Sequence, residues 1–189
     1  MKDSHVFDPA HINVLESEKR KAWQDPEAIL EQIDIKPDYV AVDLGCGSGF
    51  FTVPLSGKVR KVYGIDIQKE MLDFLEQKIR NLKIGNIETL LSTKDVIPFE
   101  TETVDLLITA NTLHEFHDLI RIINEIHRVL KTGAQAVVID FKKEDTGNGP
   151  PVAIRVAQDT AEKLFEEHGF AVVESRQLQY HYLLVFRKK

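Results

Sequence analysis

The fold is decided by one stretch of the sequence, Val40-Ala41-Val42-Asp43-Leu44-Gly45-Cys46-Gly47-Ser48-Gly49-Phe50. Its hydrophobic first part, which ends at Leu44, is typical of a parallel strand that is covered on both faces. Three glycines at alternate positions follow, and such a turn can bend sharply and let a ligand touch the main chain. Asp43 lies just before the turn, where ligands gather in open α/β sheets. We therefore expect a ligand site here; the alternative is a structural strand–helix turn that is rich in glycine.

Segments of strand and helix character alternate along the rest of the chain. The strands that we expect after the first one are residues 61–66, 86–91, 104–110, 134–141, 171–174 and 182–186. The helices that we expect are residues 26–32, 50–56, 68–82, 118–130 and 160–168, the fourth of them closed by the cation and glycine of residues 131–133. This alternation predicts an α/β sheet, mostly parallel, with helices on both faces. The last two strands are close enough in sequence to pair antiparallel.

Length and charge limit the classes of protein to which the chain can belong. Its 189 residues make one domain with a short extension, which we divide into a helical extension or lid at 1–36 and a main domain at 37–189. The formal net charge of −6 argues against general affinity for nucleic acid or for an anionic membrane surface. The basic triplet Lys19-Arg20-Lys21 is interpreted as a solvated helix face.

Cysteine content and hydropathy indicate the compartment. Cys46 is the only cysteine of the sequence, so no intramolecular disulfide can form and a cysteine zinc cluster is excluded. Residues 1–10 have no apolar core of signal-peptide length, and no apolar run is long enough to span a bilayer. We therefore expect a soluble protein in the cytoplasm.

The spacing of the glycines separates the ligand classes that use such a turn. A dinucleotide fold needs G-x-G-x-x-G, and Phe50 occupies the position of its third glycine. A P-loop is excluded, because no Gly-Lys-Ser/Thr follows. The pattern Asp43-Leu44-Gly45-Cys46-Gly47-Ser48-Gly49 instead resembles motif I of the class I S-adenosylmethionine-dependent methyltransferases.

The resemblance extends over most of the chain. Gly64-Ile65-Asp66-Ile67 resembles the end of the family's second strand, and Leu91-Ser92-Thr93-Lys94-Asp95-Val96-Ile97-Pro98-Phe99 resembles its adenine-binding segment. Val104-Asp105-Leu106-Leu107-Ile108 resembles the fourth-strand motif. The resemblance implies a Rossmann-like three-layer sandwich whose seven-stranded, mostly parallel sheet has one antiparallel strand near the C-terminus. It also makes residues 37–189 the methyltransferase domain.

The same resemblance implies which residues bind the cofactor, S-adenosyl-L-methionine, whose product is S-adenosyl-L-homocysteine. Asp66 is expected to accept hydrogen bonds from both ribose hydroxyls, a task that suits a carboxylate; its alternative role is a helix N-cap. Asp43 is expected to face the methionine ammonium, and Thr93 stands where the family usually has an adenine-binding Asp. The full set is Asp43, Leu44, Gly45, Gly47, Asp66, Ile67, Thr93, Lys94, Ala110 and Asn111.

The candidate catalytic residue is His114, which follows the fourth strand and has a side chain that titrates near neutral pH. Its alternative role is packing or support of the cofactor, because a base is needed only if the methyl acceptor carries a proton. His114 and His117 have no obvious third ligand, so we expect no metal site. Substrate selection is assigned to residues 7–23 and 142–155, which can cover the same edge of the sheet. Arg155, the earliest residue at which the helix expected at 160–168 could begin, is a weak pointer to an anionic substrate group, because the helix dipole disfavours a cation there.

The resemblance points to the branch that acts in ubiquinone and menaquinone biosynthesis. We therefore expect methyl transfer to a small-molecule acceptor, whose methylated atom (O, N, C or S) the sequence leaves open. Two alternatives remain: a module that binds S-adenosylmethionine or S-adenosylhomocysteine without catalysis, and a methyltransferase that acts on protein or RNA. The expected partner is a small-molecule substrate, with no nucleic acid and no membrane insertion, and a homodimer is left open.

Overall fold

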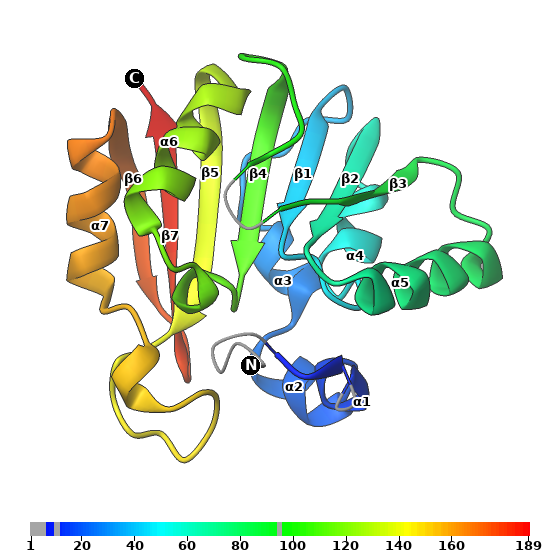
Figure 1. Cartoon of the computed structure of the whole chain (residues 1–189), viewed down its shortest axis with the longest axis horizontal. Helices are drawn as coiled ribbons and strands as arrows, with labels where there is room; N and C mark the ends of the chain where they lie inside the picture. The colour runs from blue at the N-terminus through cyan, green and yellow to red at the C-terminus, as the bar shows by residue number, and fades with distance from the viewer. Residues whose placement is uncertain (1–6, 10–11, 94–95) are drawn as a thin grey trace.

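The computed structural model of the chain describes residues 7–9, 12–93 and 96–189. A seven-stranded sheet forms the centre of this part, in the order β3-β2-β1-β4-β5-β7-β6 (Figure 1). The strands are β1 (Val40–Leu44), β2 (Lys61–Asp66), β3 (Ile87–Leu91), β4 (Val104–Ala110), β5 (Leu130–Phe141), β6 (Phe170–Gln177) and β7 (His181–Lys188). Only β7 runs antiparallel to its neighbours β5 and β6 among the described strand pairs. The predicted fold class is confirmed.

Helices cover both faces of the sheet. They are α1 (Ile12–Leu15), α2 (Glu18–Trp23), α3 (Pro26–Leu30), α4 (Thr52–Ser56), α5 (Lys69–Leu82), α6 (Leu119–Val129) and α7 (Gln158–Glu167). Two short 3-10 helices, η2 (Leu113–Glu115) and η3 (Val152–Ile154), follow β4 and β5. The start of α3 is capped, because the Asp25 carboxylate accepts from two backbone N–H groups and Pro26 occupies the first turn.

Successive side chains of each strand point to opposite faces of the sheet, and this alternation divides the core into two layers. In β1, Ala41 belongs to the layer that contains side chains of α3 and α4, whereas Val42 belongs to the layer that contains side chains of α6 and α7. The same alternation holds in β5, where Val138 belongs to the second layer and Val137 to the first. Both layers are apolar, so the central strands are hydrophobic over most of their length, as a doubly covered parallel sheet requires.

The structure differs from the expected elements at three places. The helix expected from residue 50 begins at Thr52, after the glycine turn. The turn expected at residues 131–133 is not a helix cap, because α6 ends at Val129 and the extended, buried Leu130 already pairs with Val104 in the sheet. Arg155 lies outside any helix, since α7 begins at Gln158.

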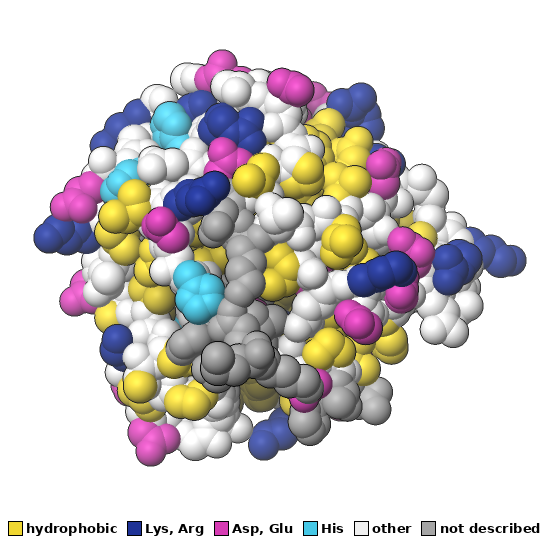
Figure 2. Space-filling model, viewed as in Figure 1, with side chains coloured by type: hydrophobic (Ala, Val, Ile, Leu, Met, Phe, Trp, Pro, Cys, Tyr) yellow, Lys and Arg dark blue, Asp and Glu magenta, His cyan; other side chains and the backbone are white. Residues whose placement is uncertain are grey.

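Two segments far apart in sequence meet at one edge of the sheet. Figure 1 shows α1 and α2 below the carboxyl ends of β1 and β4, beside the yellow loop that follows β5. Both segments expected to select the substrate therefore lie at this edge. Figure 2 shows charged side chains of both signs spread over the visible face, with hydrophobic side chains between them. Among the described residues, no helix is both long and apolar enough to cross a membrane.

Candidate functional site

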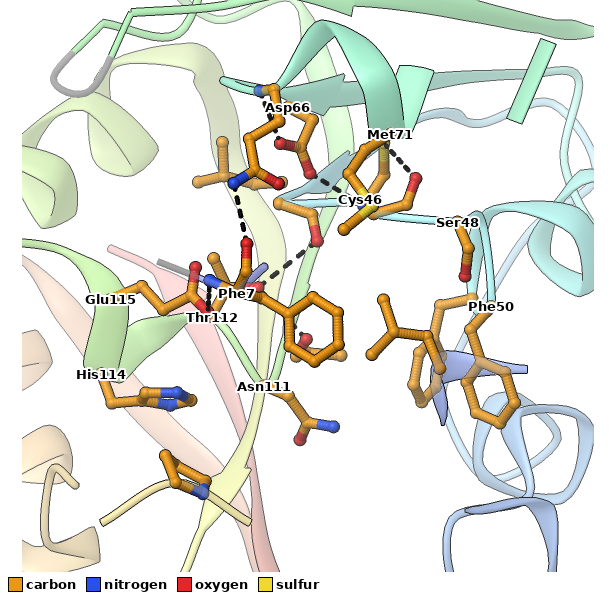
Figure 3. Close-up of a pocket in the computed structure, with 18 of the residues that line it drawn as sticks. Phe7, Cys46, Ser48, Phe50, Asp66, Met71, Asn111, Thr112, His114 and Glu115 are labelled. Atoms are coloured by element: carbon orange, nitrogen blue, oxygen red, sulfur yellow. Dashed lines mark hydrogen bonds between the residues drawn. The ribbon is translucent and has the colours of Figure 1, made fainter. Parts of the chain in front are cut away.

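A cavity of about 530 Å³ opens at the carboxyl edge of the sheet (Figure 3). Three parts of the chain line it: the N-terminal extension, the ends of β1, β2 and β4 with the turns that follow, and the loop after β5. Its volume lies within the range of about 300–1,000 Å³ that is usual for small-molecule and cofactor sites.

The glycine turn brings main chain to the wall of this cavity. Gly45 and Cys46 donate their backbone N–H groups to the carbonyl of Ile65, at 2.8 and 3.0 Å, which ties the turn to the end of β2. Gly45 has a φ of +73°, and a Cβ there would lie 2.8 Å from the Cβ of Thr112 and nearer still to its γ atoms. Glycine is therefore required at this position both by conformation and by space.

Asp66, at the end of β2, is held by the same turn. Its carboxylate accepts from the backbone N–H groups of Gly47 and Gln68, each at 2.9 Å, and it lines the cavity. Burial raises the pKa of Asp66, and the backbone hydrogen bonds oppose this shift. The cap residue of α5 is Gln68 rather than Asp66, so the alternative role as N-cap does not describe this carboxylate.

Asp43 is the buried acid at the end of β1. It is 2% exposed, and its carboxylate accepts from the Thr52 hydroxyl at 2.6 Å. Burial raises the pKa of Asp43 to about 6, with a smaller contribution from the charge of Asp66, while the Thr52 hydroxyl and Arg20 lower it. A positive ligand group beside Asp43 would favour its charged form.

Nearly all of the residues predicted to bind the cofactor face this one cavity. Those that line it are Asp43, Leu44, Gly45, Gly47, Asp66, Ile67, Thr93, Ala110 and Asn111. Lys94 lies outside the described residues. The structure thus brings together positions from four strand ends, although the individual contact of each with the cofactor stays a prediction.

His114 also lines the cavity and is paired with a buried carboxylate. Its ring Nδ1 lies 2.7 Å from Asp140, and its backbone N–H donates to the same carboxylate at 3.0 Å. Burial lowers the pKa of His114, but the hydrogen bond and charge of Asp140 outweigh it, so the net shift is upward. Asp140 was not singled out in the sequence, because it stands in a strand that reads as almost entirely apolar.

The N-terminal extension contributes a strap across the cavity. The backbone of Phe7 donates its N–H to Glu115 at 3.2 Å, and its carbonyl accepts from the Gln68 side chain at 2.8 Å. Burial raises the pKa of Glu115 to about 7. Figure 3 shows Phe7 between Asp66 and Glu115, above His114. The position of this strap rests on contacts between residues that are distant in sequence, which no local pattern reveals.

Arg20 corrects the interpretation of the basic triplet as a solvated face. It is 7% exposed and lines the cavity, whereas the neighbouring Lys19 and Lys21 are exposed. Its Nε donates to Gln24, and the Gln24 side chain exchanges two hydrogen bonds with Asn111. Gln24, the residue after α2, follows Arg20 by four positions, so the two side chains lie on the same side; this spacing alone does not show that the side faces a cavity.

Arg155 is a structural residue of the loop after β5 and does not point to an anionic ligand. It is 3% exposed, and all its hydrogen bonds go to backbone carbonyls of that loop. The acceptors are the carbonyls of Lys142, Glu144, Asn148 and Pro150, at 2.7 to 2.9 Å. The guanidinium therefore fixes the loop as a wall of the cavity and has no donor left for a substrate.

The donor set suits S-adenosylmethionine. Asp66 offers acceptors to a pair of hydroxyls, Asp43 is a buried acid that a cation would stabilise, and Arg20 is a buried cation. The bare backbone at Gly45 and Gly47 gives a ligand close approach. In the described part of the chain, no three His, Cys, Asp or Glu side chains are grouped as metal ligands would be.

Comparisons with known proteins agree with this geometry. A family model described as "Methyltransferase domain" matches residues 42–138. A solved SAM-dependent methyltransferase from Aquifex aeolicus is 31% identical, with a TM-score of 0.91 over 97% of this chain and 100% of that chain. A putative type 11 methyltransferase from Sulfolobus solfataricus is 32% identical, with a TM-score of 0.69 over 79% of this chain and 83% of that chain.

Curated relatives give a shorter match. The demethylmenaquinone methyltransferase of Bacillus mycoides (strain KBAB4) is 28% identical over 131 residues, which are 68% of this chain and 54% of the relative. The chain thus spans about half the length of the curated relatives that it matches. The family model covers half of the chain, and the Aquifex aeolicus structure matches nearly all of it. The chain therefore belongs to the class I S-adenosylmethionine-dependent methyltransferases.

Proposed function

We propose that the protein transfers a methyl group from S-adenosylmethionine to a small-molecule acceptor, and that His114 is the base that takes the acceptor's proton. The observation that carries this proposal is that one and the same cavity is lined both by the expected cofactor residues and by His114. A base and a methyl donor that share one enclosed space can act on the same acceptor atom.

The pairing of His114 with Asp140 suits a base. Because Nδ1 is hydrogen-bonded to a carboxylate, the neutral ring carries its proton there and leaves Nε2 to accept a proton from a bound molecule. The raised pKa of His114 increases its basicity. The neutral ring is the active form, so the rate of transfer is expected to rise with pH until it passes the pKa of His114 and then level off.

The remaining work of the chain is orientation and exclusion of water. When bound, the cofactor supplies a methyl group on a sulfonium sulfur, which is already strongly activated. Phe7, Trp23 and Phe141 line the cavity, and in this proposal they enclose the acceptor. Holding the acceptor in line behind such walls contributes through proximity and through exclusion of water.

The size of the cavity and the names of relatives favour a small acceptor. A volume of about 530 Å³ must hold the cofactor as well as the acceptor, which leaves room for a compact molecule. The curated relatives are named for demethylmenaquinone, itself a small molecule. The alternatives are a binding module without catalysis and a methyltransferase that acts on protein or RNA; both are outcomes of the tests below.

Cofactor binding is tested first, by calorimetry with S-adenosylmethionine and S-adenosylhomocysteine. The Asp66→Asn variant is expected to weaken binding about 10- to 100-fold, because the amide cannot accept from both ribose hydroxyls as strongly as a carboxylate does. Asp73→Asn is the matched control, since Asp73 is an exposed acid of α5 that pairs with Lys69. Equal affinities for both variants would remove Asp66 from the cofactor site.

Transfer is then tested with labelled S-adenosylmethionine over phenols, quinols, amines and thiols. His114→Asn is expected to lower the rate on an acceptor that carries a proton, and to remove the rise with pH, while cofactor affinity stays unchanged. A protein that binds the cofactor but methylates no small molecule in this screen would favour the alternatives. An unaltered pH profile in the His114→Asn variant would exclude His114 as the base.

A further inference from the structure

The guanidinium of Arg20 is a buried charge in the cavity that has no role so far. It stands 4.0 Å above the ring of Phe50, where its charge contacts the face of the aromatic system. Its Nε donates to Gln24 at 3.1 Å, and Nη1 donates to the Leu15 carbonyl at 3.1 Å. These partners are neutral, and they use only part of the five N–H donors of the side chain.

Arg20 has no carboxylate partner among residues 7–9, 12–93 and 96–189, although two acids lie near it. The Glu16 carboxylate accepts from the Ser48 hydroxyl at 2.5 Å and from the Lys78 ammonium at 2.6 Å, and the Asp43 carboxylate accepts from the Thr52 hydroxyl. Burial lowers the pKa of Arg20 to about 10, which records the cost of holding this charge away from water. A buried charge that no carboxylate contacts directly is costly, and such a group favours an anionic ligand.

The position of Arg20 indicates which anionic group of the cofactor it can reach. Gln24 joins Arg20 to Asn111, the residue after β4, and β4 pairs with β1, whose Asp43 is expected to face the methionine ammonium. Asp66, expected at the ribose, is at the end of the neighbouring strand β2. The methionine part carries one ammonium and one carboxylate, and the cavity presents the acid Asp43 and the cation Arg20 near each other at this end.

We propose that Arg20 binds the carboxylate of the methionine part of S-adenosylmethionine. A guanidinium can make two parallel hydrogen bonds to a carboxylate, and this geometry is among the strongest that side chains form. Because Arg20 belongs to α2, the N-terminal extension supplies a part of the cofactor site. The proposal rests on the cofactor of the family and is independent of the acceptor and of the role of His114.

The test measures binding of two ligands that differ in one group. The ligands are S-adenosylmethionine and its decarboxylated form, and the proteins are the wild type, Arg20→Met and Lys21→Met. The wild type is expected to bind the decarboxylated ligand about 10- to 100-fold more weakly than S-adenosylmethionine. In Arg20→Met this preference is expected to vanish, because only the ligand with a carboxylate loses a contact. Lys21 is exposed and pairs with Glu18 on the same helix, so Lys21→Met is expected to keep the wild-type preference.

Two results would overturn the proposal. One is a wild type that does not distinguish the two ligands. The other is an Arg20→Met protein that loses affinity for both ligands by the same factor, which would show a structural effect on the extension. If Arg20→Met does not fold, Arg20→Lys decides, because a retained point charge should keep a reduced preference for the carboxylate. Failure of the wild type to bind either ligand would instead refute the assigned cofactor.

Discussion

Two glycines of the turn after β1 have different reasons to be glycine. Gly45 and Gly47 both have positive φ values, +73° and +51°. A Cβ on Gly45 would overlap the side chain of Thr112, whereas a Cβ on Gly47 would meet only Leu15, at an ordinary 3.6 Å. The two positions therefore separate backbone strain from steric overlap within one turn.

We predict that Gly45→Ala destabilises the protein by about 1–3 kcal/mol more than Gly47→Ala does. Both variants carry the strain of an L-residue at positive φ, and only Gly45→Ala adds the overlap with Thr112. Urea denaturation of the two variants beside the wild type measures the difference in the free energy of unfolding. Equal losses would mean that Thr112 moves aside at little cost.

Single residues differ in how far the sequence could predict them. Asp43 and Asp66 were predictable, because each stands at a fixed offset from the end of a hydrophobic run. Asp140 and Arg20 were not: the first is hidden in an apolar strand, and the second in a charged triplet. Their importance depends on partners across the fold, His114 and the cavity, and no local spacing encodes such a partner.

At the scale of elements, local pattern predicts periodic segments well and their boundaries poorly. The helix α5 begins and ends within one residue of its expected bounds, because one apolar face runs along it. The boundary between α6 and β5 was misplaced, since tertiary pairing of Leu130 with Val104 overrides the capping signal of residues 131–133. Arg155 likewise acts on a loop by binding carbonyls 5 to 13 residues away.

The first residue of β7 joins the N-terminal extension to the sheet. His181 is fully buried, its ring stacks on Trp23 of α2 with centroids 5.0 Å apart, and neither ring nitrogen has a hydrogen-bond partner within the described structure. The pKa of His181 is lowered to about 3, mainly by burial and in smaller part by nearby positive groups. Those groups are Arg20, Arg155, Lys142 and His114.

A loss of stability in acid follows from this histidine. Its pKa falls on folding, so the stabilisation is complete above about pH 6.5, the unfolded value, and is lost as pH falls toward 3. We predict that His181→Phe, which keeps the stacking but cannot be protonated, loses less stability than the wild type between pH 7 and pH 5. The expected difference is about 2 kcal/mol. Urea denaturation at both pH values measures it, and identical losses would show that His181 does not carry the acid sensitivity.

At the scale of the whole molecule, the extension is attached to the cavity by contacts with separate elements. Glu16 joins the glycine turn at Ser48 to α5 at Lys78, Gln24 binds Asn111 after β4, and Trp23 packs on β7. The division into an extension at 1–36 and a domain at 37–189, with the extension as a lid, stays a prediction. These contacts give it a test, because they should set how readily the extension opens.

We predict that Lys78→Met increases local opening of residues 12–24. Lys78 of α5 forms an ion pair with Glu16 of the extension, with 2.6 Å between the ammonium nitrogen and the carboxylate oxygen. Both side chains are about three-quarters buried. A pair of this kind contributes up to about 1 kcal/mol, which corresponds to a 2- to 5-fold faster amide exchange where opening limits the exchange.

Amide hydrogen exchange with S-adenosylhomocysteine at saturation measures this effect. Lys69→Met is the matched control, since Lys69 is also on α5 but pairs with Asp73 of the same helix, again at 2.6 Å. Exchange in residues 12–24 should rise only in Lys78→Met, while exchange in α7 and β6, on the far side of the sheet, should stay unchanged in both variants. A rise in both lysine variants would mean that α5 itself has loosened. No rise in either variant would mean that the contacts of Gln24 and Trp23 hold the extension closed without the ion pair. The ion pair between Lys78 and Glu16 would then not control the opening of the extension.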